Sequence, residues 1–398
     1  MNYRIETLSE YPFYHLGKLL QGVTPKSHQM INVSIGEPKN LPPKEVLDIL
    51  NIESKTLSQY PTSKGTEGLR KSYCEWLSSR FELLNDLDPD KNTLPLSGTR
   101  EGIFSFIQAV VDTSKNNPLV VMPNPFYKIY EGATHLAGAL PFFVNTLSEE
   151  NFKPDFESVP ETVWKDCQLL ILCSPSNPTG YCMSKEEYSK VLDLAEKFNF
   201  VVCSDECYVD IYPSDKPAPN GLIECSDLTK ENSKAVIFHS LSKRSNLAGL
   251  RSGFVCANEA LISKLLLYRT YHGATLSLPA QSASAWAWSN QEHVEINRTD
   301  YDKKYKTALN EIDSIHKVIR PDGSFYLWIE LPADDLTFTK KLYSDHNVIA
   351  LPGSYLGVDN DGINPGSNFI RVAIVHDEET VKKAAFAINT VLNHFSNN

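Results

Sequence analysis

The 398-residue sequence has no long apolar run, no cluster of basic residues and no cysteine motif. No stretch approaches the roughly 20 apolar residues that cross a bilayer, and the first residues lack the apolar core of a secretion signal. We therefore expect a cytoplasmic protein without membrane contact. The net charge of −11, with dispersed lysines and arginines, argues against a nucleic acid partner, because phosphate backbones are bound by clustered cations.

Recognisable metal and dinucleotide motifs are also missing. The eight cysteines show neither C-x-x-C nor a disulfide framework spacing, which predicts reduced thiols. Cys203 and Cys207 flank Asp205, but no histidine lies at a ligand spacing nearby, and we predict no metal site. No Gly-x-Gly-x-x-Gly follows a predicted strand, so a dinucleotide-binding fold has little support.

What is present is an alternation of short apolar segments with amphipathic segments of helical length, from about residue 93 to 258. This alternation predicts an α/β fold with a mostly parallel sheet and right-handed crossovers. The predicted strands are 93–96, 119–122, 140–144, 169–173, 200–204, 235–238 and 253–257, and the predicted helices are 100–112, 127–137, 184–198 and 259–271. Ser184 and Glu187 have the spacing of a capping box at the start of the third helix.

The pattern changes after this region. A long helix from residue 279 to about 315 is predicted to bridge to a smaller α+β unit with strands 325–329, 348–351 and 369–374. The first forty residues are rich in Pro, Gly and Tyr, which predicts an arm with little helix that packs on the small unit. The predicted organisation is an arm (1–40), a large domain (41–288) and a small domain (289–398).

A single lysine follows the apolar segment 235–238, in the sequence Ser-Leu-Ser-Lys that ends at Lys243. Ligands gather at the carboxyl ends of strands, and a buried lysine with a lowered pKa can form an imine with an aldehyde. Ser240, Ser242 and Arg251 offer hydroxyl and guanidinium donors for a phosphate. An exposed loop lysine is the plain alternative for Lys243 taken alone.

The segment from Ser240 to Gly253 resembles the lysine signature of the fold-type I aminotransferases of class I/II, which use pyridoxal phosphate (PLP). The signature is Ser-x-x-Lys followed by Gly-x-Arg-x-Gly. Seven segments between about residues 34 and 371 follow the order of this family. The resemblance implies a seven-stranded sheet between helices in a large domain, a smaller α+β domain, PLP as cofactor, and amino acid and 2-oxo acid substrates.

The resemblance also implies three catalytic residues. Lys243 would hold the cofactor and move a proton. Asp205, at the end of an apolar strand, needs a cationic partner, and the protonated ring nitrogen would be that partner. Tyr208 would donate to the phenolic oxygen of the ring, as would Asn177 in the turn Asn-Pro-Thr-Gly. A helix cap, a packing tyrosine and a generic turn remain the alternatives for Asp205, Tyr208 and Asn177 taken singly.

The remaining cofactor contacts come from three other segments. Gly98, Thr99 and Arg100 join a strand to a helix, where free backbone N–H groups cradle a phosphate. Tyr127 is implied to cover the ring face, with Phe126 as the fallback. Tyr60 is implied to reach the phosphate of a neighbouring subunit, which predicts a homodimer with shared sites.

Gly36, Asn177 and Arg371 are the implied substrate contacts, and Arg371 would bind the α-carboxylate. Peripheral segments are most similar to the succinyldiaminopimelate aminotransferases of bacterial lysine biosynthesis. These segments are residues 11–13, 22–25, 36–39, 98–101, 242–246, 271–273 and 364–368. That similarity implies amino transfer between glutamate and N-succinyl-2-amino-6-oxopimelate, whose further carboxylates need further cations. The unranked candidates are Arg100, Lys128, Arg244 and Arg269. An aspartate or aromatic aminotransferase, a PLP-dependent carbon–sulfur lyase and a ligand-sensing regulator are the alternatives.

Overall fold

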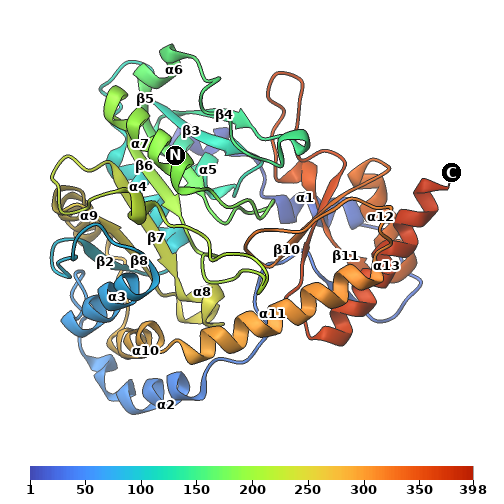
Figure 1. Cartoon of the computed structure of the whole chain (residues 1–398), viewed down its shortest axis with the longest axis horizontal. Helices are drawn as coiled ribbons and strands as arrows, with labels where there is room; N and C mark the ends of the chain where they lie inside the picture. The colour runs from blue at the N-terminus through green and yellow to red at the C-terminus, as the bar shows by residue number, and fades with distance from the viewer. Residues whose placement is uncertain (398) are drawn as a thin grey trace.

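The computed structural model describes residues 1–397 and has two lobes (Figure 1). The large lobe contains a seven-stranded sheet in the order β2-β8-β7-β6-β5-β3-β4. Its strands are β2 (Thr93–Leu96), β3 (Leu119–Asn124), β4 (Leu140–Asn145), β5 (Cys167–Cys173), β6 (Val201–Asp205), β7 (Ala235–Ser240) and β8 (Gly253–Ala257). Only β8 runs antiparallel to its neighbours, so the mostly parallel sheet is confirmed.

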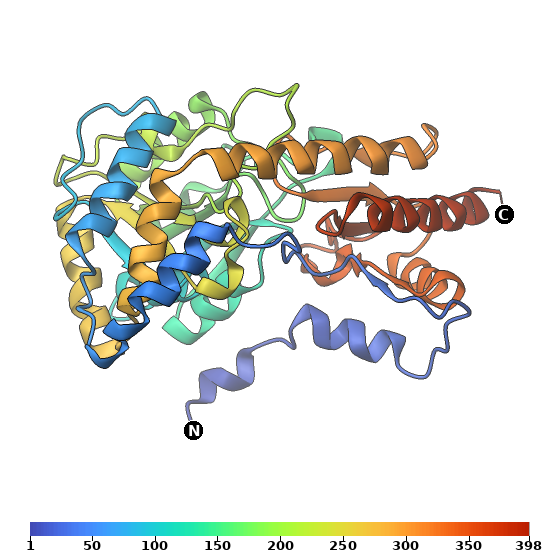
Figure 2. The same ribbon diagram turned by 90° about the horizontal axis from the view of Figure 1, so that it is seen from below.

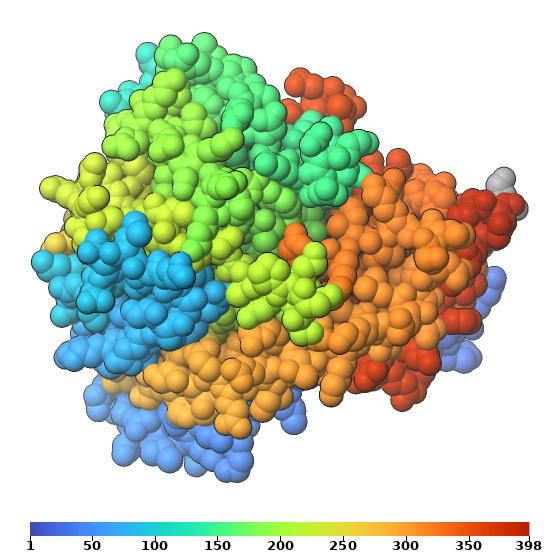
Figure 3. All heavy atoms as spheres, viewed as in Figure 1, coloured from blue at the N-terminus to red at the C-terminus, as the bar shows by residue number. Residues whose placement is uncertain are grey.

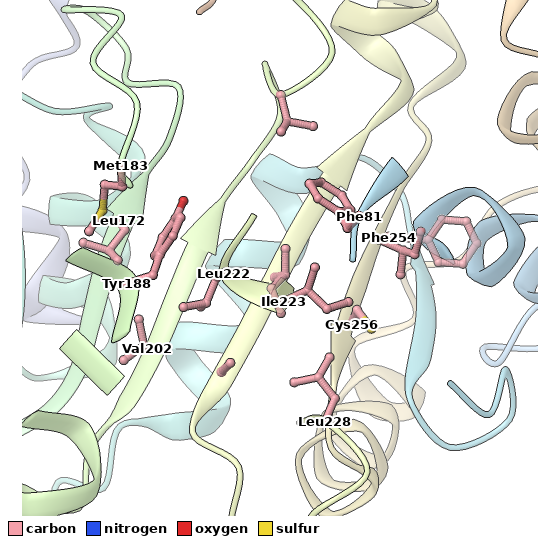
Figure 4. Close-up of a cluster of buried hydrophobic side chains, with 14 of the residues drawn as sticks. Phe81, Leu172, Met183, Tyr188, Val202, Leu222, Ile223, Leu228, Phe254 and Cys256 are labelled. Carbon is pink, nitrogen blue, oxygen red and sulfur yellow. The ribbon is translucent and has the colours of Figure 1, made fainter. Parts of the chain in front are cut away.

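Helices cover both faces of this sheet, as predicted. One face packs on α4 (Thr99–Val110), α5 (Ile129–Ala137) and α9 (Glu259–His272). The other face packs on α2 (Lys44–Glu53), α3 (Glu67–Arg80), α6 (Glu161–Asp166), α7 (Lys185–Phe198) and α10 (Leu278–Ser289). Leu169 belongs to the first core and Leu170 to the second, because successive side chains of a strand point to opposite faces. Figure 4 shows part of the second core, where Leu172 and Val202 of the sheet lie near Tyr188 of α7. The capping box of Ser184 and Glu187 opens α7.

The small lobe is an α+β unit. Its antiparallel sheet has the order β12-β13-β10-β9, and a separate parallel pair joins β1 (Ile31–Asn32) to β11 (Val348–Ile349). The remaining strands are β9 (Val318–Ile319), β10 (Tyr326–Glu330), β12 (Leu351–Pro352) and β13 (Phe369–Ala373), and the helices are α11 (Glu292–Glu311), α12 (Asp335–His346) and α13 (Glu378–Ser396). The domain boundaries at 40/41 and 288/289 stay predictions.

The predicted long helix is wrong in one respect, because it is two helices. α10 ends at Ser289, Asn290 has an extended backbone with φ −101° and ψ 124°, and α11 begins at Glu292. Asparagine is a weak helix former, so the break falls where helical propensity is low. The two helices then pack on different lobes.

The prediction of little helix in the arm is also wrong. Residues Pro12–Leu20 form α1, with proline at the first turn, where its missing N–H has no helical partner to lose. Pro12 and Leu16 are buried, and α1 contacts α12 and β12 of the small lobe. The preceding 3₁₀ helix (Tyr3–Thr7) contacts α5, so the arm reaches both lobes (Figure 2).

The sheet register brings three strand ends to one edge. Cys173 pairs with Asp205, Asp205 with Phe238, and Ser240 with Gly253. The segments that follow β5, β6 and β7 therefore start side by side, which is where parallel sheets bind ligands. Within residues 1–397, no helix is long and apolar enough to span a bilayer.

Candidate active site

A cavity of about 350 Å³ opens at this edge of the sheet. Twelve of the predicted site residues line it: Gly36, Thr99, Arg100, Tyr127, Asn177, Asp205, Tyr208, Ser240, Ser242, Lys243, Arg251 and Arg371. Tyr60 lies on the surface instead, fully exposed, and Gly98 lies behind Arg251. Within residues 1–397, no group of three or more His, Cys, Asp or Glu side chains is arranged to hold a metal ion.

Lys243 is carried by α8 (Leu241–Arg244), a short helix directly after β7. Its Nζ donates a hydrogen bond to the Gly36 carbonyl oxygen at 2.5 Å. Burial lowers the pKa of Lys243 to about 8, and the positive charges of Arg371 and Arg251 act in the same direction. About a tenth of the amine is therefore neutral at pH 7, and the neutral amine is the form that attacks an aldehyde.

Asp205 ends β6 and is only 5% exposed. Its carboxylate accepts hydrogen bonds from the Tyr130 hydroxyl at 2.8 Å and from the Cys207 backbone N–H at 3.2 Å. Burial raises the pKa of Asp205, and no lysine, arginine or histidine among residues 1–397 forms an ion pair with it. A buried carboxylate of this kind calls for a cation from a ligand, and the protonated nitrogen of a pyridine ring fits.

Arg371, in β13, is a buried cation with unused binding capacity. Its guanidinium donates to Asn177 Oδ1 at 2.8 Å and to the Ser34 carbonyl oxygen at 2.6 Å, and it stacks on the Tyr326 ring at 4.3 Å. The Nε atom has no hydrogen-bond partner, and no carboxylate of the described residues pairs with this side chain. The carboxylate of an amino acid would complete it.

The opposite part of the cavity suits a phosphate. Gly98 caps the N-terminus of α4 with φ 87°, and a side chain at this position would overlap the guanidinium of Arg251. Ser240 and Ser242 line the same cavity, and Ser240 Oγ accepts from the Ser242 N–H at 3.1 Å. A helix N-terminus, an arginine and two hydroxyls together form a site for an anion.

Tyr127 lies in the cavity lining, whereas Phe126 is buried in the core and stacks on Phe143 at 5.2 Å. The geometry therefore places Tyr127, rather than Phe126, where a ring can be covered. Arg100 donates from Nε to the Tyr127 hydroxyl at 2.6 Å. The guanidinium of Arg100 thus faces the same space.

Several lining residues were not predicted. Tyr130 could have been found, because it lies three residues after Tyr127 in a predicted helix and so shares its face. Tyr326, whose hydroxyl is 3.1 Å from that of Tyr208, comes from the small lobe, and Tyr11 comes from the arm. No local pattern marks Tyr326 or Tyr11, because both reach the cavity only through tertiary folding.

Three of the four candidates for binding further carboxylates do not line the cavity. Arg244 is buried in an ion pair with Asp210 at 2.6 Å, and Arg269 is buried in an ion pair with Glu101. These two are therefore neither substrate contacts nor solvated surface charges. Lys128 pairs with Glu131 at 3.4 Å outside the cavity. Arg100 is the one candidate of the four in the lining.

Residues 28–388 match the family described as aminotransferase class I and II. The chain belongs to this family. Enzymes of the family use pyridoxal phosphate, and the buried carboxylate, the lysine and the anion site of this aminotransferase fit that cofactor. The family match, together with the observed sheet, confirms the predicted fold of the pyridoxal phosphate-dependent aminotransferases.

Solved structures and curated relatives agree with this assignment. An aminotransferase from Neisseria meningitidis is 38% identical with a TM-score of 0.93, covering 98% of this chain and 100% of that one. A probable N-succinyldiaminopimelate aminotransferase from Thermus thermophilus is 25% identical with a TM-score of 0.84, covering 96% and 100%. The LL-diaminopimelate aminotransferase of Aquifex aeolicus is 28% identical over 98% of both chains.

Proposed function

We propose that this aminotransferase exchanges an amino group between glutamate and a diaminopimelate-type substrate with a carboxylate far from the reacting carbon. The charge of the cavity carries the proposal: of the described residues, four cations line it, Arg100, Lys243, Arg251 and Arg371, against the single carboxylate of Asp205. In our assignment, Lys243 reacts and Arg251 binds phosphate. Arg371 and Arg100 then remain for two carboxylates of the substrate.

The proposed roles combine what the family resemblance implies with the contacts in the cavity. When bound, pyridoxal phosphate supplies an aldehyde that carries the amino group and a ring that stabilises negative charge at the substrate α-carbon. Asp205 keeps the ring nitrogen protonated, and the Tyr208 hydroxyl and the Asn177 amide bind the phenolic oxygen. Lys243 Nζ would accept the proton from the α-carbon of the amino donor and pass it to the cofactor. With the 2-oxo acid, Lys243 would carry the proton in the opposite direction, from the cofactor to the α-carbon of the product.

Two forms of the substrate are candidates. The N-succinylated form is supported by the sequence resemblance and by the printed name of the Thermus thermophilus neighbour. The free LL-diaminopimelate form is supported by the names of the curated relatives, which are 26 to 29% identical. Both carry the second carboxylate that Arg100 would bind.

A half-reaction panel tests this proposal. The PLP-loaded enzyme is mixed with glutamate, LL-diaminopimelate, N-succinyl-LL-diaminopimelate, aspartate or phenylalanine, and the loss of its visible absorption band is followed. Glutamate and one diaminopimelate form should react fastest. Faster reaction of aspartate or phenylalanine would overturn the substrate assignment, and release of ammonia and pyruvate from an amino acid would indicate a lyase instead.

Arg100→Met tests the distal carboxylate contact. A charge-assisted hydrogen bond contributes about 1.5 to 3 kcal/mol, so kcat/KM for the diaminopimelate substrate should fall about 10- to 150-fold. Alanine, which has no second carboxylate, is the internal control and should react unchanged. An equal loss with alanine would contradict the assignment and place Arg100 at the cofactor.

We further propose a homodimer in which Tyr60 binds the phosphate at the partner's site. The full exposure of Tyr60 in the single chain leaves its hydroxyl available for this contact. Tyr60→Phe should weaken PLP binding by about tenfold, because one hydrogen bond to a charged group is lost. Tyr3→Phe, at an exposed tyrosine of the arm, is the control. A monomer in light scattering, or equal PLP affinity in both variants, would contradict the proposal.

A further inference from the structure

The short helix α8, which carries Lys243, is hydrogen-bonded to a side chain near the start of α11. Asn297, 3% exposed, donates from Nδ2 to the backbone carbonyl oxygens of Lys243 and Arg244, each at 3.2 Å. Because α8 is only four residues long, these carbonyls lie at a helix end, where intrahelical donors run out. Asn297 therefore completes the hydrogen bonding of the catalytic helix itself.

A second contact joins the same two parts of the chain. Arg244, directly after the lysine, donates from Nη1 to the Ala287 carbonyl oxygen and from Nη2 to Gln291 Oε1, both at 2.9 Å. These acceptors belong to the end of α10 and the residue before α11. A guanidinium at a helix C-terminus satisfies its free carbonyls and stabilises its dipole. The break between α10 and α11 is thus packed directly on α8 (Figure 1).

The break is also one of the places where the chain passes between the lobes. From it, α11 runs along the molecule to the small lobe, where Tyr301 and Tyr305 join the small-lobe core (Figures 2 and 3). A second passage, residues 36–40, lies beside it, because Asn40 Nδ2 donates to Asn297 Oδ1 at 3.3 Å and to Asp300 Oδ2 at 2.8 Å.

Both passages contact Lys243. Asn297 donates to its backbone carbonyl oxygen, and in the chain without cofactor the Gly36 carbonyl oxygen accepts from its Nζ. A movement of the small lobe that shifts α11 or residues 36–40 must therefore shift Lys243 or break these bonds. The side chain and the backbone of Lys243 therefore contact the two neighbouring segments, residues 36–40 and the start of α11, that connect the lobes.

We propose that Asn297 is a positioning residue that couples the position of the small lobe to that of the Lys243 amine. The inference rests on the proposed role of Lys243 in catalysis. Asn297 does not line the cavity, so its loss should leave substrate binding through Arg371 intact. The reaction step should suffer instead, because an amine displaced by a fraction of an ångström transfers a proton less efficiently.

Asn297→Ala tests the proposal, with Asn92→Ala as matched control. Asn92 is 4% exposed and also donates two bonds to backbone carbonyls, those of Leu228 and Ala257 at 3.0 Å, at the opposite edge of the sheet. Both variants should lose similar thermal stability. In the PLP-loaded enzyme, only Asn297→Ala should speed hydrogen–deuterium exchange of residues 241–246, by about 30-fold, since two hydrogen bonds of roughly 1 kcal/mol each are lost.

Kinetics and spectra give independent readouts. In Asn297→Ala, kcat should fall about tenfold with KM within twofold, and the pH at which the visible cofactor band changes should shift; Asn92→Ala should show neither. Unchanged exchange and an unchanged band titration in Asn297→Ala, or the same changes in both variants, would overturn the coupling. If the alanine variant does not fold, Asn297→Ser replaces it with the same criteria. Absence of transamination by the wild-type enzyme would refute the proposed function instead. The stability and exchange measurements do not require transamination, so the two failures can be told apart.

Discussion

The clearest quantitative expectation concerns Arg371, the buried guanidinium with no carboxylate partner among the described residues. Arg371→Met removes the charge and every donor, whereas Arg371→Lys keeps the charge but loses the planar pair of donors. Two charge-assisted bonds to a substrate carboxylate are worth about 3 to 6 kcal/mol together, and one about 1.5 to 3 kcal/mol. The variants therefore separate charge from geometry.

We expect kcat/KM for glutamate to fall about 10²- to 10⁴-fold in Arg371→Met and about 10- to 150-fold in Arg371→Lys. The assay is the single-turnover loss of the visible cofactor band. PLP affinity should stay within about threefold in both variants, because our assignment places the phosphate contacts at Arg251, Ser240 and Ser242. A fall of less than tenfold in Arg371→Met would refute the role of this residue in binding the α-carboxylate.

Stability offers a second check on the same reasoning. Arg244 is also buried, but it pairs with Asp210, which Arg80 contacts as well at 3.0 Å. Arg244→Met should cost about 3 kcal/mol, at the lower end for a broken buried pair, because the buried Asp210 charge keeps only one of its two cations. Arg371→Met leaves no such charge, and we expect a loss below about 2 kcal/mol. Urea unfolding of both variants measures the difference. A larger loss for Arg371→Met would show that its cation is stabilised within the protein after all.

Three further outcomes follow from the same site. Asp205→Asn should lower kcat about 10²- to 10³-fold, because a buried ion pair worth 3 to 5 kcal/mol is lost; steady-state rates within tenfold of wild type would contradict this. Arg251→Ala should weaken PLP affinity about 10- to 150-fold in a fluorescence titration, and unchanged affinity would remove it from the phosphate site. Because the pKa of Lys243 is lowered to about 8, its amine is protonated below that pH, so PLP capture by the cofactor-free enzyme should slow about tenfold per pH unit below 8. A rate independent of pH there would argue against Lys243 as the reacting group.

The sheet was predictable from the sequence because its strands are buried on both faces and read as short apolar runs. The segment 253–257 has the observed bounds of β8. The break at Asn290 was missed, since apolar periodicity continues through it and the extended backbone is visible only once the two helices pack on different lobes. Packing likewise turned residues 12–20 into a helix.

The position of a site residue was predictable where it lies at or just after a strand end, as for Asp205 and Lys243. The role of a residue was not predictable where it depends on a distant partner. Arg244 reads as a free cation in the sequence, but Asp210, 34 residues earlier, pairs with it in the folded chain. The partner of Lys128 was visible, because Glu131 is three residues away and so on the same helical face.

The central claim is that Lys243 holds the cofactor covalently and transfers the proton. The most direct measurement is borohydride reduction of the PLP-loaded enzyme, followed by mass spectrometry of its proteolytic peptides. The pyridoxyl group should be found on Lys243, and Lys243→Ala should show neither the adduct nor the visible band. An adduct on another lysine of the wild-type enzyme, or a full visible band in Lys243→Ala, would contradict the account.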